Sequence, residues 1–230
     1  RINRPSLIIK ICNDILPVGT RMKRFKFQSH DKCCLCGQTE NITHMFQCND
    51  ESRKQWRRQL IKGLRFRLQQ LNTLKGTGDT LCSVITDWLD NGRVFSGKYD
   101  RKYHKAIISQ NYIGWIHIFF GHFSQEWELL QGTTRLDSGR SRSPYLWGAS
   151  VVELCLTYSI KLWEQRNQDI HGHNANDSEQ LLRTKHIEEI NRLQLLQNQI
   201  HPSDNFLFHG ISDLKDSANS NTMANWIASR

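Results

Sequence analysis

The sequence predicts a mainly α-helical protein, a helical bundle with a small cysteine- and histidine-containing module near its N-terminus. In several segments apolar residues recur every three or four positions, as they do along one face of an α-helix. No segment alternates convincingly between apolar and polar residues, as a half-buried strand would. Four of the seven cysteines fall between Cys33 and Cys48, with a histidine among them. These three observations together indicate the fold class.

The N-terminal third is predicted to hold two helices, separated by a basic connector and the cysteine-rich stretch. Residues 6–16 form a short apolar helix, which Pro17 ends. Residues 50–72 form a longer one, in which acidic residues at the start favour the positive end of the helix dipole. Its apolar residues are spaced by four, four, four and three positions: Trp56, Leu60, Leu64, Leu68 and Leu71.

The remaining sequence is predicted to hold four helices and a polar tail. The strongest pattern lies at 102–131, where a wide apolar stripe is typical of a helix that faces a core. The helix at 144–169 has two apolar sides and is expected to be central. The predicted helices are 80–90, 102–131, 144–169 and 177–200, and the predicted loops are 76–79, 93–101 and 132–143.

The stretch from Cys33 to Cys48 has the ligand types and the spacing of a zinc site. Cys33, Cys36, His44 and Cys48 give C-x2-C, seven residues, and then H-x3-C. Tetrahedral zinc takes four such sulfur and nitrogen ligands at about 2.0–2.3 Å, and residues four apart share one face of a helix. The doublet Cys33-Cys34 leaves two candidates for the first ligand, of which we favour Cys33. Ordinary buried thiols are the alternative, which the clustering with His44 disfavours.

These elements divide the chain into three expected regions. Residues 1–75 form a basic zinc-knuckle module with flanking helices. Residues 76–200 form an aromatic-rich helical bundle, for which seven tryptophans and ten phenylalanines are enough. Residues 201–230 form a polar C-terminal tail. Because the first residue is Arg1, we expect the chain to be a piece of a longer polypeptide.

Positive charge is concentrated around the cysteine-rich stretch. Of the net charge of +9, residues 1–75 carry 16 Lys and Arg against 5 Asp and Glu, residues 76–175 are balanced, and residues 176–230 are net −2. A localised basic surface attracts polyanions, so we expect RNA or DNA as the partner and no small-molecule substrate. The predicted nucleic-acid-binding residues are Arg21, Lys23, Arg24, Lys26, Arg53, Lys54, Arg57, Arg58, Lys62 and Arg65.

Each basic segment also has a plainer interpretation. In the connector, Phe25 and Phe27 alternate with cations, a pattern that can hold phosphates and stack on bases; alternatively, the two phenylalanines anchor a solvated turn to the core. In the helix at 50–72, seven cations from Arg53 to Arg67 are expected on one face without matching acids. Such a face is ordinarily just solvated.

Composition and motifs argue against several other classes of protein. Seven cysteines, odd in number and clustered, favour an intracellular compartment, nuclear or cytoplasmic, over a disulfide framework. The longest apolar run, 112–120, is too short to span a membrane. The carboxylates are scattered and no nucleophile or phosphate-loop motif is present, so no catalytic residue is predicted and we expect no enzyme. His171 and His173 are interpreted as a helix end, with a metal-dependent nuclease around Asp169 as the alternative.

Several of these residues resemble the zinc-binding region that follows reverse transcriptase in non-LTR-type retroelements. The likeness covers about residues 7–60, and two later pieces, 110–115 and 163–172, are more loosely similar to the tails of retroelement-derived proteins of protists and algae. The residues that carry it are Asn13 to Thr20 with the Leu-Pro-x-Gly turn, the connector, the run Cys33-Cys34-Leu35-Cys36-Gly37, His44-Met45-Phe46, Cys48 and Trp56.

The resemblance implies a nucleic-acid-binding appendage of an RNA-directed DNA polymerase, which helps to hold template RNA or target DNA. Zn²⁺ would be its cofactor, and the reverse transcriptase part of the same polypeptide a further partner. The polymerase's acidic catalytic motif is absent, and the doublet at Cys33 departs from the family's single cysteine followed by proline. The competing hypothesis is a protein-interaction or scaffold role, in which helices 102–131 and 144–169 dock onto the polymerase or onto another copy.

Overall fold

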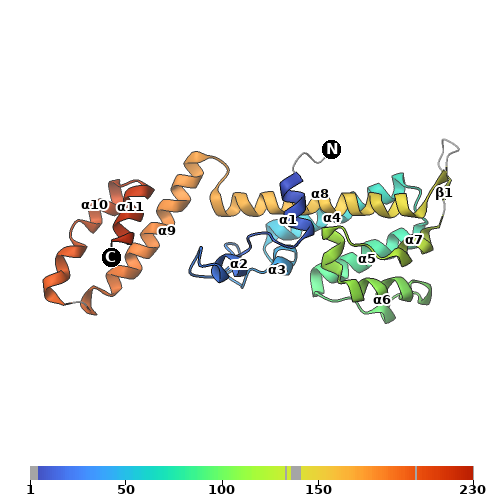
Figure 1. Cartoon of the computed structure of the whole chain (residues 1–230), viewed down its shortest axis with the longest axis horizontal. Helices are drawn as coiled ribbons and strands as arrows, with labels where there is room; N and C mark the ends of the chain where they lie inside the picture. The colour runs from blue at the N-terminus through green and yellow to red at the C-terminus, as the bar shows by residue number, and fades with distance from the viewer. Residues whose placement is uncertain (1–4, 133, 136–140, 200, 230) are drawn as a thin grey trace. The chain divides into compact units, whose positions relative to one another are not determined.

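The chain is mainly α-helical, as the sequence predicts, with the cysteine- and histidine-containing module near its N-terminus. The computed structural model describes residues 5–132, 134–135, 141–199 and 201–229. The chain divides into two compact units, residues 1–164 and 165–230, and the boundary falls within α8. Figure 1 shows the elements of the first, which are α1 (Pro5–Cys12), α2 (Gly19–Arg24), α3 (Ile42–Gln47), α4 (Glu51–Gln70), α5 (Lys75–Asn91), η1 (Ser96–Lys98), η2 (Arg101–Tyr103), α6 (His104–Ile113), η3 (Trp115–Phe120), α7 (Gln125–Gln131), the two-residue antiparallel strands β1 (Thr134–Arg135) and β2 (Ser141–Arg142), and α8 (Pro144–His171).

These two units replace the three regions expected from the sequence. A boundary after residue 75 is wrong because one continuous core extends from Ile11 to Trp163 and includes both α4 and α5. The tail at 201–230 is also folded, because Ile211 and Met223 pack with Ile190 in a second small core. The elements of the second unit beyond α8 are α9 (Ala175–Leu195), η4 (Gln197–Gln199), η5 (Pro202–Phe208), α10 (Ile211–Ser217) and α11 (Ser220–Ala228).

The aromatic centre of the first unit surrounds a side chain of the cysteine-rich stretch. Phe46, on α3, is fully buried. Its ring centroid lies 5.8 Å from that of Trp56 on α4, 6.1 Å from Trp88 on α5 and 4.8 Å from Phe119 in η3. Aromatic pairs at such separations attract each other beyond the effect of burial alone. The cysteine-rich module is therefore anchored in the core rather than forming a separate knuckle.

Helices α4 and α8 pack closely along one side of this core. The indole Nε1 of Trp56 donates to the carbonyl of Tyr158 at 3.1 Å, and the Tyr158 hydroxyl donates to the carbonyl of Gln59 at 3.0 Å. Gly63 makes this approach possible, since a Cβ there would collide with the Tyr158 ring. The predicted helices at 50–72 and 144–169 are both confirmed.

The long helix predicted at 102–131 is instead broken into η2, α6, η3 and α7. Gly114 and Gly121 have φ angles of +96° and +102°, which lie outside any right-handed helix and which glycine adopts without a Cβ penalty. The buried Gln110 holds the break together: its amide donates to the carbonyl of Gly114 at 3.3 Å, and its carbonyl oxygen accepts from the N–H of Ser124 at 2.9 Å. The apolar periodicity survives the break because both halves face the same core.

One predicted loop also needs correction. Residues 76–79 are part of α5 rather than a loop, and Thr77 and Gly78 are buried there, so the helix begins five residues earlier than expected. In the second unit, the carboxylate of Glu179 on α9 accepts hydrogen bonds from the backbone N–H of Ser220 at 2.7 Å and from the Ser220 hydroxyl, which ties α11 to α9.

Within the described residues, no helix is long and apolar enough to span a bilayer.

The position of Phe46 predicts a large stability loss on truncation. We expect Phe46→Ala to lower the free energy of unfolding by about 3–5 kcal/mol, because it removes a fully buried ring and leaves a cavity among three aromatic side chains. Urea denaturation followed by tryptophan fluorescence, at a fixed metal concentration, measures the change. Phe27→Ala is the control, because this side chain is 74% exposed. Equal losses in the two variants would contradict the central place of Phe46.

Candidate metal centre and basic surface

A tight backbone turn brings the first two ligands together. Gly37 adopts a φ of +72°, and its N–H donates to the carbonyl of Cys33 at 2.9 Å. The N–H of Cys33 in turn donates to the carbonyl of Gln38 at 2.7 Å. An isolated antiparallel bridge between Lys32 and Thr39 closes the base of the turn. This local hydrogen bonding fixes the C-x2-C pair independently of the rest of the fold.

Helix α3 positions the second pair. The side chain of Asn41 caps the helix by accepting from the N–H of His44 at 2.7 Å. The helix ends at Gln47, and Cys48 follows with extended backbone at ψ 134°. His44 therefore lies within the first turn and Cys48 just beyond the last. Cys48 is buried, whereas His44 is half-buried.

The four predicted ligands converge. The Sγ atoms of Cys33 and Cys48 are 4.0 Å apart, and Cys36 Sγ lies 3.2 Å from His44 Nε2. All four ligand atoms lie within 4.8 Å of one another. Ligands at about 2.0–2.3 Å from a tetrahedral ion are roughly 3.3–3.8 Å apart, so the cluster is close to the size that one metal ion requires.

The structure also resolves the choice within the cysteine doublet. Cys33 is buried and belongs to the cluster, whereas Cys34 is exposed and does not. Cys82 and Cys155 are buried in the core, as predicted from their apolar periodicity. Among the described residues this is the one group of three or more Cys, His, Asp and Glu side chains placed to hold a metal ion. The alternative centre around Asp169, His171 and His173 is not assembled there.

The electrostatics of the cluster favour a bound cation. A hydrogen bond with Cys34, together with backbone N–H groups of Cys36 and Leu35, lowers the pKa of Cys33 to about 3. Burial raises the pKa of Cys48 to about 12, and the neighbouring sulfurs of Cys33 and Cys36 add to the rise. Thiolates this close would repel one another, which favours the protonated form of Cys48. A metal ion removes that repulsion and takes the place of the protons.

Two arginines of α4 do not belong to an exposed basic face. Arg53 and Arg57 are only 3% and 7% exposed, so the expectation that they lie on such a face is wrong. The guanidinium of Arg57 donates through Nη1 to the carbonyls of Phe46 and Cys48, at 3.2 and 2.9 Å. Its Nε lies 3.4 Å from Asp90 Oδ1 on α5. Arg57 is thus committed to joining α3, α4 and α5.

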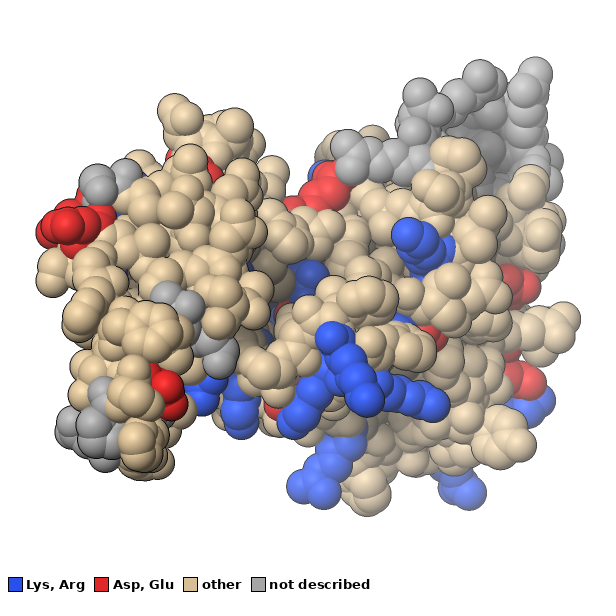
Figure 2. Space-filling view, turned by 60° about the vertical axis from the view of Figure 1, so that its left-hand side comes forward, with Lys and Arg blue, Asp and Glu red and all other residues tan. Residues whose placement is uncertain are grey.

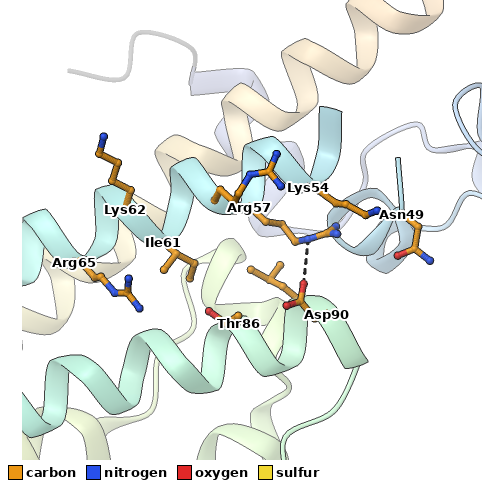
Figure 3. A pocket seen from close by; sticks show the side chains of 10 residues that line it. Asn49, Lys54, Arg57, Ile61, Lys62, Arg65, Thr86 and Asp90 are labelled. Carbon is orange, nitrogen blue, oxygen red and sulfur yellow. Dashed lines mark ion pairs between the residues drawn. The ribbon is translucent and has the colours of Figure 1, made fainter. Parts of the chain in front are cut away.

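The other cations of α4 are accessible, and several of them line a cleft between α4 and α5. Arg58 and Lys54 lie 2.6 and 3.9 Å from the carboxylate of Glu51, so the helix has more acidic partners than expected. Lys62 and Arg65 are exposed farther along. The cleft, shown in Figure 3, has a volume of about 630 Å³. Its lining consists of Asn49, Lys54, Arg57, Arg58, Ile61, Lys62, Arg65, Thr86, Leu89 and Asp90.

The cations of the connector divide into two pairs. Arg21 is half-buried, donates to the carbonyl of Leu16 at 2.6 Å and lies 3.7 Å from Asp14. Lys23 lies 3.4 Å from Asp31. Arg24 and Lys26 are exposed. The connector's first pair is therefore partly occupied within the protein, whereas its second pair is open to solvent.

The aromatic residues of the connector also face solvent. Phe25 and Phe27 are 59% and 74% exposed, so the interpretation that they anchor the turn to the core is wrong. The guanidinium of Arg24 lies 5.9 Å from the ring centroid of Phe25. Figure 2 shows Lys and Arg side chains gathered in one part of the face that it displays, while Asp and Glu are more scattered. The connector thus offers cations and aromatic rings together.

Comparison with protein-family models, with curated proteins and with solved structures found no match to this chain.

The cluster geometry predicts which cysteines a metal ion needs. We expect the wild-type chain to bind one metal ion and Cys48→Ser to bind none, because a hydroxyl does not replace the buried thiolate. Cys34→Ser is expected to keep the ion, since Cys34 lies outside the cluster. Atomic emission on the purified variants, referred to protein concentration, measures the stoichiometry. Metal loss in Cys34→Ser but not in Cys33→Ser would place the ligand at the other member of the doublet.

The contacts of Arg57 predict a structural rather than a surface role. We expect Arg57→Ala to lower the free energy of unfolding by about 2–4 kcal/mol, because two buried carbonyls lose a charged donor. Arg58→Ala, one position along the helix, should change it by no more than about 1 kcal/mol, because an exposed ion pair contributes little. Urea denaturation of the two variants tests this. Equal, small effects would mean that solvent replaces the Arg57 contacts.

Proposed function

We propose that this chain is a zinc-stabilised nucleic-acid-binding domain, which contacts the phosphates of RNA or DNA and has no catalysis of its own. The observation that carries the proposal is the set of exposed cations next to the Cys3His cluster, in the second half of the connector and along α4. Sequence-independent phosphate contacts of this kind supply most of the affinity of non-specific nucleic-acid binders.

The donor set supports zinc as the metal. Three cysteine sulfurs and one histidine nitrogen are the ligands of structural zinc sites, in which all four positions come from protein. Such an ion supplies folding energy rather than a reactive water, since no position remains for a substrate. Cys33, Cys36, His44 and Cys48 would hold it, and the connection of α3 to α4 and α5 would carry its effect into the helices.

The resemblance to the region after reverse transcriptase in retroelements supports the same proposal. It covers the connector, the ligands and α4 as far as residue 60, and so includes Arg24, Lys26, Lys54 and Arg58 but not Lys62 and Arg65. In this proposal the domain is the C-terminal appendage of a retrotransposon reverse transcriptase. It would help to hold RNA or DNA for a polymerase that lies elsewhere in the same polypeptide.

A scaffold role is a second candidate, supported by a different observation. Most aromatic side chains of 102–131 and 144–169 fill the protein's own core, including Trp115, Phe119, Trp127 and Trp147. They are not available to a partner. Tyr112 and Tyr145, however, are 94% and 70% exposed. A docking surface built from such residues would not need the basic connector, which separates the two hypotheses.

A salt series distinguishes nucleic-acid binding from docking. We expect the purified chain, with its metal content measured, to bind labelled single-stranded RNA and duplex DNA with log K falling linearly against log salt. Reversing the charge of the exposed connector cations, in Arg24→Glu/Lys26→Glu, should weaken binding by roughly tenfold or more, because each loses a charge-assisted contact to phosphate.

Arg101→Ala/Lys105→Ala is the control, since it removes two exposed cations outside the connector and α4. Metal bound at one ion per chain but no binding of either nucleic acid at low salt would reject the nucleic-acid proposal. That outcome would leave docking as the function to test.

A further inference from the structure

We infer that the cleft between α4 and α5 binds successive phosphates of a nucleic-acid strand, and that the Cys3His module holds this cleft in its binding geometry. The inference rests on the proposed function and specifies where on the chain it occurs. The ligand that such a cleft would bind is a row of adjacent phosphate groups. A nucleic-acid strand provides this row along its backbone, and a free polyphosphate provides a shorter one.

The lining of the cleft is strongly unbalanced in charge. Five cations, Lys54, Arg57, Arg58, Lys62 and Arg65, line it together with one carboxylate, Asp90. Asp90 is paired with Arg57. In the part of the chain that the structure describes, Lys62 and Arg65 form no ion pair with a carboxylate. Positive charge without a carboxylate partner is therefore greatest at the end of the cleft away from Asn49 and Asp90, where Arg65 also interacts with the Cys82 thiol.

The remaining lining makes the cations more effective. Ile61 and Leu89 are apolar, and the hydroxyl of Thr86 donates to the carbonyl of Cys82 at 2.8 Å. Figure 3 shows Ile61 and Thr86 between the two helices, with Lys62 and Arg65 on the α4 side. Charges beside an apolar wall attract an anion more strongly than charges surrounded by water. A volume of about 630 Å³ has room for more than one phosphate group with its sugar.

The metal module is bonded to both walls of this cleft. On the α4 wall, Arg57 donates to the carbonyls of Phe46 and Cys48. On the α5 wall, the carbonyl of Trp88 accepts from Nε2 of Gln47 at 2.8 Å. Asn49, which follows the ligand Cys48, is itself part of the lining. A change in the position of Cys48 would therefore move one end of the cleft.

The first test measures the cleft cations directly. Labelled single-stranded RNA is titrated with the full chain over a salt series, using wild type, Lys62→Ala/Arg65→Ala and the matched control Arg67→Ala/Lys161→Ala. Arg67 is two residues from Arg65 but lies beside Glu153 of α8, outside the cleft. We expect the cleft variant to bind roughly tenfold more weakly, with a salt slope shallower by about 1.4 for two lost phosphate contacts on a single strand. The control should match wild type.

The second test asks whether the metal module holds the two walls of the cleft in place, an arrangement called the clamp below. Gln47→Ala removes the bond to the α5 wall but no metal ligand, so we expect it to keep its metal and bind RNA several-fold more weakly. Chelation of wild type should weaken binding at least as much. It should also raise hydrogen exchange of the amides at 86–91, which are on α5 and distant in sequence from the ligands. Unchanged exchange and unchanged affinity after chelation would overturn the clamp.

The outcomes separate this inference from the proposed function. If Lys62→Ala/Arg65→Ala matches its control while Arg24→Glu/Lys26→Glu loses binding, the connector is the site and the cleft inference is overturned. If wild type binds no nucleic acid, the proposed function fails with it. Inorganic triphosphate serves as competitor: equal affinity for triphosphate and RNA, both lost in the cleft variant, would assign the cleft to a free polyphosphate and overturn its assignment to a strand.

Discussion

The packing of Phe46 is the contact on which the rest of the structure depends. This residue lies two positions after His44 and two before Cys48, so any ion held by those ligands is held beside a core side chain. Its ring meets aromatic rings from α4, α5 and η3, which come from three separate parts of the sequence. The metal module and the helical bundle therefore share one folding unit, and a boundary between them has no physical basis.

The cations of α4 serve two purposes that their sequence pattern does not distinguish. Arg57 is buried and stabilises the junction of three segments, because its planar guanidinium reaches two carbonyls and a carboxylate at once. Lys62 and Arg65 are exposed and form no ion pair with a carboxylate in the described part of the chain. A variant that removes Arg57 together with Arg58 would change both the stability of the fold and the affinity for an anion, so the two effects could not be separated. Lys62 and Arg65, in contrast, can be changed with little effect on folding.

Local chemistry made much of this site predictable from the sequence. The ligand set follows from spacing within 16 residues, and the helices at α4 and α8 follow from their periodicity. The breaks at Gly114 and Gly121 were not predictable from that periodicity, because the apolar pattern continues across both glycines. The burial of Arg53 and Arg57 was missed because amphipathic patterns assign cations to solvent. Their contacts depend on tertiary packing; the acceptors of Arg57 lie on the chain before α4 begins.

The place of the metal site within the fold explains why a chain with a large aromatic core would still need an ion. Helix α3 has six residues, which is too short to be stable alone, and of residues 25–44 only Cys33 and Glu40 are buried. The core holds α3 through the adjacent side chains of Met45 and Phe46, whereas the segment that carries Cys33 and Cys36 has little apolar support of its own. A metal ion would supply order there, at the end of the cleft where α4 and α5 meet α3. Because Phe46 joins the metal module to the bundle, loss of the ion would affect the folding of α3 and, through Gln47 and Cys48, the shape of the basic cleft.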